Sequence, residues 1–459
     1  MGGKYQAYTK YKDYESVFLE NIPAVWEVKP LHSLCGFRQG KAHEPFVDSN
    51  GEFICVNARF VSTQGGTLKR CNMNLTPAKL FDVLMVMSDL PNGRALARAF
   101  FVNDQKNYAV NQRICAITAK NIDAKFLFYQ LDRSPYFLMY DDGSNQTHLS
   151  NDAFKKYPVL LPSLAEQEKI ANFLDHETAK IDTLIEKQQQ LIKLLKEKRQ
   201  AVISHAVTKG LNPNAPLRDS GVEWLGEVPE HWTPLQIRRV LPVMEQGKSP
   251  DCENKVAEVH EWGVLKTSCV NNGVYNSDAN KTLPNEIAPF PQYEVKNGDI
   301  LMSRASGSIN LIGSVAYVYE TRPKILLSDK VFRLHLSSQV NRLFFSYVMR
   351  SSFMRSNIGR AISGAEGMAN NITKGAVIGF RFALPPLKEQ EAITGFISEK
   401  VNKLDELVLK SKFAIELIKE RRTALISAAV TGKIDVRGWV APVPPSARDA
   451  AQNNQQAAT

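Results

Sequence analysis

The stretch LPSLAEQEKIANFLDHETAKIDTLIEKQQQLIKLLKEKRQAVISHAVT (residues 161–208) decides how the chain is organised, because it occurs twice. The second copy, LPPLKEQEAITGFISEKVNKLDELVLKSKFAIELIKERRTALISAAVT (residues 384–431), aligns with the first without a gap, and about half of the aligned residues are identical. A repeat of this kind predicts a protein that is built from two related halves.

Each copy has the pattern of one long amphipathic helix. Apolar residues recur at intervals of three or four positions with Lys, Glu and Gln between them, and Leu184 and the aligned Leu407 belong to this apolar stripe. At 1.5 Å per residue such a helix is a rod on the order of 60 Å. Two rods cover their apolar stripes most simply by packing on each other. We therefore predict an antiparallel, coiled-coil-like pair of helices related by a pseudo-twofold axis.

The composition indicates a multi-domain protein with an anionic partner. The 459 residues, 44% hydrophobic and 23% charged, are too many for one core. The formal net charge of +10 favours nucleic acid as the partner, although the charge could also serve solubility alone. Six cysteines occur without a C-x-x-C pair, and no apolar run approaches the ~18 residues of a membrane span. We expect a cytoplasmic protein with reduced cysteines and no membrane contact.

Each long helix follows a globular domain, and similar leading segments with Trp26 and Trp232 precede the two domains. We expect residues 1–160 to form the first globular domain with its leading segment, 161–210 the first long helix, 211–383 the second globular domain with its leading segment, 384–437 the second long helix, and 438–459 a disordered tail rich in Pro, Ala and Gln.

Both globular domains have the same predicted order of strands and helices, which places the chain in the α+β class. In the first domain we expect strands at 53–60, 82–87, 97–102 and 113–118, a helix at 125–131, a polar loop at 141–151 and a last strand. In the second we expect strands at 299–303, 314–319 and 330–336, a helix at 342–350, a loop at 363–371 and a strand at 376–384. Sequence identity between the two domains is low. This favours two domains that recognise different targets, and the competing explanation is neutral drift of the sequence.

The motifs of common enzymes are missing from the sequence. Gly247, Lys248 and Ser249 end like a phosphate-binding loop, but Pro242 stands where that loop needs a glycine. A DNA methyltransferase would need a glycine loop for its cofactor and an Asn/Asp-Pro-Pro-Tyr/Phe motif for the flipped base, and neither occurs. We therefore predict no catalytic residue, no metal site and no activity of the chain by itself.

Polar and basic side chains gather in the predicted loops of both domains. Arg, Lys, Asn and Gln present the donors that fit base edges in the major groove of DNA, although a solvated surface role remains the alternative for each residue. The candidate DNA-binding residues are Gln64, Lys69, Arg70, Arg94, Asn145, Gln146 and His148 in the first domain, and Lys266, Arg304, Ser306, Ser308, Asn310, Arg360, Asn370 and Asn371 in the second.

Four motifs together resemble the specificity subunit of type I restriction-modification systems. They are GEVPEHW (226–232), GDILMSR (298–304), LPPLKEQ (384–390) and KERRTALISAAVTG (419–432), and the resemblance extends over residues 11–437. The first half departs from the family pattern, because Phe81 stands where the family has the glycine of Gly-Asp-Ile-Leu.

The resemblance implies that each globular domain is a target-recognition domain, and that each reads one half of a bipartite, asymmetric site in double-stranded DNA. It also implies that the long helices set the spacing between the half-sites and dock two modification subunits. Those partners would bring S-adenosylmethionine and flip an adenine for N6 methylation. Restriction subunits would bring ATP and Mg²⁺ for translocation and cleavage, and this chain itself would bind no cofactor.

On the long helices, the residues expected to contact these partners are Glu166, Gln167, Arg199, Glu389, Gln390 and Arg422. The competing hypothesis is a non-catalytic coiled-coil scaffold that joins two protein-binding domains.

Overall fold

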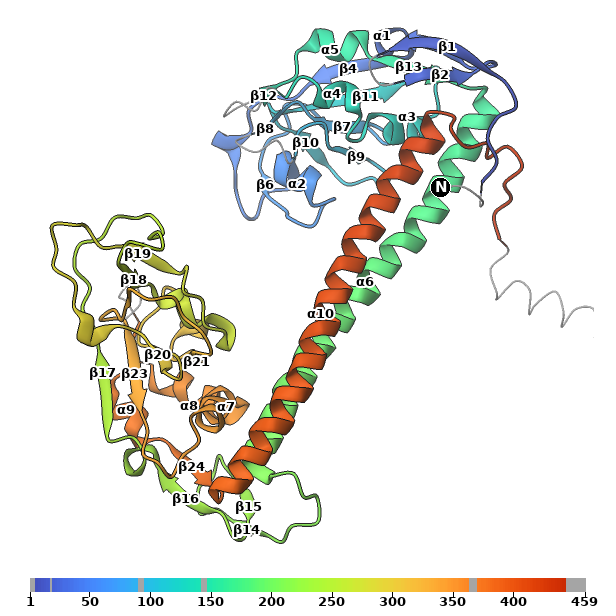
Figure 1. Cartoon of the computed structure of the whole chain (residues 1–459). Helices are drawn as coiled ribbons and strands as arrows, with labels where there is room; N and C mark the ends of the chain where they lie inside the picture. The colour runs from blue at the N-terminus through green and yellow to red at the C-terminus, as the bar shows by residue number, and fades with distance from the viewer. Residues whose placement is uncertain (1–4, 17–18, 90–94, 142–146, 363–369, 443–459) are drawn as a thin grey trace, which may run out of the picture. The chain divides into compact units, whose positions relative to one another are not determined.

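The computed structural model describes residues 5–16, 19–89, 95–141, 147–362 and 370–442 (Figure 1). The chain forms two compact units, residues 1–187 with 414–459 and residues 188–413. The two long helices, α6 (Leu164–Lys209) and α10 (Leu387–Val430), each contribute to both units. Each unit therefore consists of one globular domain and half of each long helix.

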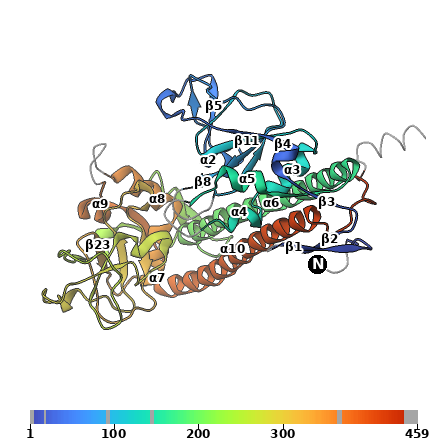
Figure 2. The same ribbon diagram turned by 90° about the horizontal axis from the view of Figure 1, so that it is seen from above.

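The predicted helix pair is confirmed. α6 and α10 run side by side in both views (Figure 1 and Figure 2). In the first unit the first half of α6 packs with the second half of α10, and in the second unit the second half of α6 packs with the first half of α10. The two helices are therefore antiparallel. None of the helices that the structure describes has the length and apolar character needed to cross a bilayer.

The first globular domain is built around two sheets. The antiparallel four-stranded sheet has the order β4 (Cys35–Gln39), β11 (Ile114–Ala119), β7 (Val83–Val86) and β9 (Ala99–Phe101). In the three-stranded sheet, β5 (Phe53–Val56) pairs in parallel with β10 (Tyr108–Val110) and antiparallel with β6 (Arg70–Cys71). Three two-stranded ladders complete the domain: β1 (Tyr11–Ser16) with β2 (Leu19–Pro23), β3 (Glu27–Pro30) with β13 (Pro158–Leu161), and β8 (Ser88–Asp89) with β12 (Thr147–His148).

Short helices connect these strands. They are α1 (Leu31–Leu34), the 3₁₀ helix η1 (Glu44–Phe46), α2 (Ala58–Ser62), α3 (Ala124–Leu131), α4 (Pro135–Leu138) and α5 (Asn151–Lys156).

The second globular domain repeats the two larger sheets of the first and two of its three ladders. Its four-stranded sheet has the order β17 (Val243–Gln246), β23 (Val331–His335), β20 (Ile300–Ser303) and β21 (Val315–Tyr317). In its three-stranded sheet, β18 (Gly263–Leu265) again has one parallel neighbour, β22 (Ile325–Leu326), and one antiparallel neighbour, β19 (Asn280–Thr282). The ladders of β14 (Leu217–Asp219) with β15 (Glu227–Pro229) and of β16 (Thr233–Gln236) with β24 (Arg381–Leu384) match those of the first domain.

The helices of the second domain are α7 (Arg342–Arg350), α8 (Ser352–Ala361) and α9 (Lys374–Gly379), with 3₁₀ helices η2 (Ile237–Arg239), η3 (Thr267–Gly273), η4 (Pro291–Tyr293) and η5 (Ile309–Leu311).

Two strand predictions were wrong in part, and both for the same reason. The strand expected at 53–60 ends at Val56 because Asn57 Oδ1 accepts a hydrogen bond from Phe60 N and starts α2. The strand expected at 376–384 begins as α9, because Thr373 Oγ1 accepts from Ala376 N. A capping side chain satisfies the free amides of a first helical turn, and this outweighs the strand preference of the apolar residues that follow.

Each hydrophobic core combines a globular domain with the ends of both long helices. The first core contains Trp26, Phe173 from the start of α6 and Ala429 from the end of α10. At the end of α10 the chain turns tightly against the domain. Gly432 has φ +71°, and a Cβ atom there would lie 2.3 Å from Cγ of Pro23, so only glycine fits. The second core contains Trp232 together with residues from the end of α6 and the start of α10.

Candidate nucleic-acid interface

The candidate residues of the second domain gather where β20 ends. Arg304 follows this strand directly, and its backbone oxygen accepts a hydrogen bond from Ile372 N at 2.9 Å. Ala305 forms a β-bridge with Asn371. Residues 304–310 and 370–372 are thus held next to each other, and we name these two segments the second reading edge. The bridge places Arg304 next to Asn371. The two segments contain six of the residues that the sequence predicted: Arg304, Ser306, Ser308, Asn310, Asn370 and Asn371.

The first domain has the same arrangement at the end of β7. β8 follows β7 after one residue and pairs with β12, so that His148 lies opposite Ser88 and Thr147 opposite Asp89. We name β8 and β12 the first reading edge. His148 is exposed there. The other predicted residues of this region, Arg94, Asn145 and Gln146, lie outside the described residues.

The remaining candidates belong to other segments than the two reading edges. Gln64 serves its own domain, since its side-chain nitrogen donates to the backbone oxygens of Val61 at 3.1 Å and Ala99 at 2.9 Å. Arg70 donates to the backbone oxygen of Gly51 at 3.1 Å. Gln64 and Arg70 are both exposed, so for them a base contact stays a prediction beside these contacts within the domain. Lys69 and Arg360 are exposed, and Lys266 is half-buried at the end of β18.

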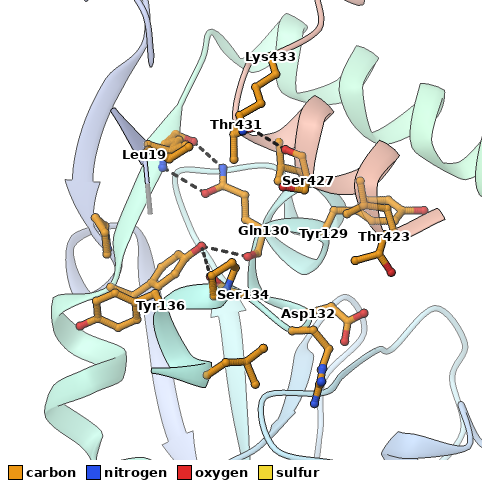
Figure 3. A pocket seen from close by; sticks show the side chains of 18 of the residues that line it. Leu19, Tyr129, Gln130, Asp132, Ser134, Tyr136, Thr423, Ser427, Thr431 and Lys433 are labelled. Atoms are coloured by element: carbon orange, nitrogen blue, oxygen red, sulfur yellow. Dashed lines mark hydrogen bonds between the residues drawn. The ribbon is translucent and has the colours of Figure 1, made fainter. Parts of the chain in front are cut away.

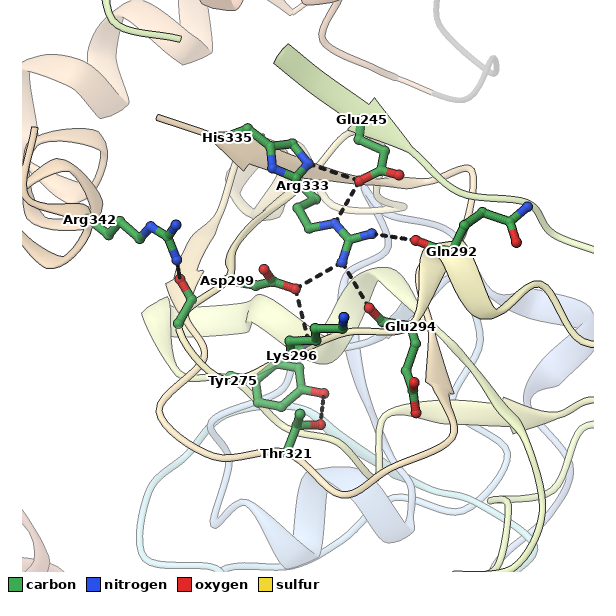
Figure 4. A network of polar contacts seen from close by, with 11 residues as sticks. Glu245, Tyr275, Gln292, Glu294, Lys296, Asp299, Thr321, Arg333, His335 and Arg342 are labelled. Atoms are coloured by element: carbon green, nitrogen blue, oxygen red, sulfur yellow. Dashed lines mark hydrogen bonds and ion pairs between the residues drawn. The ribbon is translucent and has the colours of Figure 1, made fainter. Parts of the chain in front are cut away.

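An ion-pair network around the buried Arg333 holds the strands that carry the second reading edge (Figure 4). Arg333 on β23 places Nε 2.7 Å from Glu245 Oε2 and Nη1 3.1 Å from Asp299 Oδ2. Burial would raise the pKa of Glu245, but hydrogen bonds from His335 and Arg333 bring it below its ordinary value. The network therefore fixes β17, β23 and the start of β20 relative to one another.

An aspartate holds the turn before the strand in the same way in both domains, although Phe81 replaces the glycine of the family motif in the first domain. Asp299 accepts a hydrogen bond from Lys296 N at 2.9 Å, and Asp82 accepts one from Lys79 N at 2.7 Å. The residue before each aspartate has a left-handed backbone, with φ +87° at Gly298 and +67° at Phe81. The first domain thus adopts the turn of the glycine motif with a phenylalanine, so the two strands β7 and β20 begin alike.

Comparison with known proteins identifies the family. Residues 23–194 and 229–416 match the model of the type I restriction modification DNA specificity domain. The chain belongs to this family. It is 30% identical over 243 residues to the EcoEI specificity subunit of Escherichia coli, an alignment that covers 52% of this chain but only 40% of that subunit. It is 24% identical over 325 residues to the MjaVIII specificity subunit of Methanocaldococcus jannaschii, covering 69% of this chain and 72% of that one.

A solved structure has a similar fold. It comes from work on the complex assembly and conformational transition of the type I R-M system, and it superposes with a TM-score of 0.63 at 14% identity over 90% of this chain and 99% of the other. The two matches to the family model show that the two globular domains are two specificity domains of one chain.

Two glutamines that were predicted to contact partners are buried and fasten each specificity domain to its helix. Gln167 donates to the backbone oxygen of Pro162 at 2.8 Å and accepts from Asp123 N, the capping residue of α3. Gln390 makes the equivalent bonds, to the oxygen of Pro385 at 2.8 Å and from Asn341 N at 2.7 Å. With 2% and 0% of their surface exposed, neither glutamine can meet a partner subunit.

The two glutamates beside them are also used inside their own units. Glu166 is buried and accepts hydrogen bonds from Trp26 Nε1 at 3.1 Å and from the Tyr8 hydroxyl. Burial and this contact with Glu166 raise the pKa of Tyr8. Glu389 pairs with His231 at 2.8 Å. For the buried Glu166 the prediction of a partner contact is corrected to a contact within the chain. The side chain of Glu389 is 30% exposed, so its partner contact stays a prediction. Arg199 and Arg422 form ion pairs between the two long helices.

Leucines on the outside of the helix pair were not predicted as contact residues. Leu184 and the aligned Leu407 are 50% and 47% exposed, and Leu194 and the aligned Leu417 are 60% and 48% exposed. The expectation that Leu184 and Leu407 are buried between the helices was therefore wrong. Leu184 and Leu417 belong to the first unit, and Leu194 and Leu407 to the second. We name Leu184 with Leu417 the leucine pair of the first unit, and Leu194 with Leu407 the leucine pair of the second. The two pairs are equivalent, because Leu184 aligns with Leu407 and Leu194 aligns with Leu417.

Proposed function

We propose that the chain is the DNA sequence-recognition subunit of a type I restriction-modification complex, and that each specificity domain reads one half of a bipartite, asymmetric site. One observation supports this above all. The two domains have the same strand order and the same reading edge, but the side chains on the two edges differ. Two domains with the same fold but different polar side chains can recognise two different half-sequences, because base identity is read through side-chain donors and acceptors.

The helix pair fits the task of setting the distance between half-sites. A continuous helix has a fixed rise of about 1.5 Å per residue, so its length defines a spacing that a flexible linker could not. The +10 net charge of the chain supports an association with the phosphate backbone.

We assign the docking of two modification subunits to the two leucine pairs. Exposed leucines lie at equivalent positions of both units, and exposed apolar surface favours protein contacts. The modification subunits would bring S-adenosylmethionine and methylate a flipped adenine at N6. Restriction subunits would add ATP- and Mg²⁺-dependent translocation and cleavage. The chain would then contribute recognition without catalysis, in the cytoplasm, where the DNA of a prokaryotic host lies.

The test uses the chain together with its modification subunits. Adenine methylation is mapped by sequencing the genome of a host that carries the system, and binding is then measured on a mapped site and on duplexes with one or both half-sites scrambled. We expect strong binding only when both half-sites are intact. Scrambling one half-site should remove the base preference in that half and leave the preference in the other half unchanged. Equal binding to all duplexes would contradict the proposal and favour the scaffold hypothesis.

A further inference from the structure

A cavity of about 400 Å³ lies in the first unit, between the specificity domain and the last turns of α10 (Figure 3). Its walls come from the segment that follows α3, from Arg98, and from one face of α10. This volume is within the range of small-molecule sites in proteins. The lining residues used below are Arg98, Tyr129, Asp132, Arg133, Tyr136, Arg422, Thr423, Ile426, Ser427 and Lys433.

In the second unit an arginine occupies the equivalent position. Asp132 is the ninth residue after Asp123, the cap of α3, and Arg350 is the ninth after Asn341, the cap of α7. The guanidinium of Arg350 lies 5.5 Å from the centre of the Tyr347 ring. The corresponding residue of the first unit is Tyr129, which lines the cavity. The second unit therefore covers this tyrosine with its own side chain, and the first unit has a short carboxylate at the same place.

The two units also differ in the hydrogen bonds between the specificity domain and the end of the long helix that packs on it. In the second unit, Gln200 Nε2 donates to the backbone oxygen of Arg350 at 2.8 Å, and Ser204 Oγ accepts from Ser352 N at 2.8 Å. The aligned residues of α10 are Thr423 and Ser427, which both line the cavity. The Thr423 hydroxyl donates to Lys419 O in its own helix. Thr423 is too short to reproduce the bond of Gln200, so the first contact is left open as a cavity.

The charges around the cavity favour an anion. Arg98, Arg133, Arg422 and Lys433 line it together with a single carboxylate, Asp132. Arg422 is already paired with Asp182, and Arg98 Nη1 is 3.9 Å from Asp132 Oδ2. Burial raises the pKa of Asp132, and burial together with neighbouring Arg98 lowers the pKa of Arg133.

The backbone at the cavity wall is strained where it places two of these arginines. Arg133 and Ala97 both have φ +57°, a left-handed conformation that is costly for residues other than glycine. They are joined by a 2.7 Å hydrogen bond from Arg133 N to the oxygen of Ala97.

We propose that this cavity binds a small organic anion with a flat ring, of the class of nucleoside monophosphates. Arg98 and Arg133 would hold the phosphate, while Tyr129, Tyr136 and Ile426 would cover the ring. The ligand would take the place that Arg350 fills in the second unit and would join the first specificity domain to the end of α10. The site is independent of the reading edges, so this inference does not rest on the proposed function.

Titration calorimetry of the full chain with AMP, without DNA, tests the assignment. We expect one site, and weaker binding of adenosine and of inorganic phosphate, because each lacks half of the contacts. Arg133→Gly should weaken AMP binding about tenfold by removing a charge-assisted hydrogen bond. Glycine accepts the left-handed backbone, so the variant should keep its fold. Asp132→Arg should abolish binding by filling the cavity as Arg350 does, and Lys155→Gln, an exposed lysine on α5, should leave it unchanged.

Three results would overturn the inference. The first is the absence of any binding of AMP, GMP or UMP at millimolar concentration to the folded chain, with folding checked by thermal unfolding. The second is wild-type affinity in both cavity variants. The third is binding of arginine methyl ester in place of the nucleotides, which would assign the cavity to a cation. If Arg133→Gly weakens duplex binding while wild type does not bind nucleotides, the cavity belongs to the DNA interface instead.

Discussion

Arg199 on α6 pairs with Asp405 on α10, with Nε of the arginine 3.1 Å from Oδ1 of the aspartate. The aligned residues form the same pair in the first unit, where Arg422 Nε is 3.0 Å from Asp182 Oδ1. Positions that contact each other reciprocally are the mark of a twofold-related interface. Together the two pairs specify one antiparallel register of the long helices.

Reversing one of these charges should loosen the helix pair without unfolding it. Both partners of the Arg422 pair are partly exposed, so we expect Arg422→Glu to lower the free energy of unfolding by about 1 kcal/mol at most. The double variant Arg422→Glu with Asp182→Arg should recover that loss. Urea denaturation of the single and double variants measures it, and a double variant no more stable than Arg422→Glu alone would show that the pair contributes nothing to register.

Lengthening the helices should change the spacing of the DNA site and leave its bases unchanged. Four residues inserted after Gln189 and after the aligned Lys412 add about one helical turn, or about 6 Å, to both helices. Methylation mapping of the variant should then return the same two half-sequences with a different gap, or no methylation. Altered bases within a half-site would contradict the separation of reading from spacing.

Arg304 should determine preference in one half-site only. Removing a side chain that contacts a base edge costs about 1–3 kcal/mol and relaxes the choice of base at one position. We expect Arg304→Ala to show this effect in the half-site read by the second specificity domain. The matched control is Arg381→Ala, an exposed arginine on β24 outside the reading edge. Equal effects of the two variants on all duplexes would reduce Arg304 to a general phosphate contact.

Each leucine pair should dock one modification subunit. Leu184→Glu with Leu417→Glu should lower the number of bound modification subunits from two to one, and the same changes at Leu194 and Leu407 should remove the other. Because these side chains are exposed, the thermal stability of the free chain should not fall. Native mass spectrometry gives the stoichiometry. Leu217→Glu, at an exposed leucine on β14, is the control.

Gln390 should be essential to the joint between the second specificity domain and α10. Its side chain satisfies Asn341 N and Pro385 O in a buried site, so Gln390→Ala leaves both without their partner. We expect a loss of about 2 kcal/mol in the free energy of unfolding. Gln167→Ala should behave alike in the first unit. Denaturation with guanidinium chloride is the measurement, and a neutral Gln390→Ala variant would contradict the fastening role.

The sequence by itself determined the features that arise from local patterns. The periodicity of residues 161–208 and its copy defined both long helices. The turn residues between apolar runs located strands β7, β9, β11, β20, β21 and β23 to within a few residues, while many shorter strands were not predicted. Helix α7 has the predicted bounds, because Asn341 caps it and a glycine-free run of good packing residues follows. The strand predictions failed where Asn57 and Thr373 start a helix inside an apolar run. These features depend on neighbours within a few positions, so the order of residues is enough.

Only the tertiary structure decided which polar residues are available to a partner. Gln167 and Gln390 look like surface residues at the start of a charged helix, but they are buried against segments about 40 to 50 positions earlier in the chain. Leu184 belongs to an apolar stripe and is nevertheless exposed. Thr423, nearly 300 positions from Asp132 in the chain, lines the same cavity. Burial and cavities depend on contacts between distant segments, and such contacts leave no mark in local periodicity.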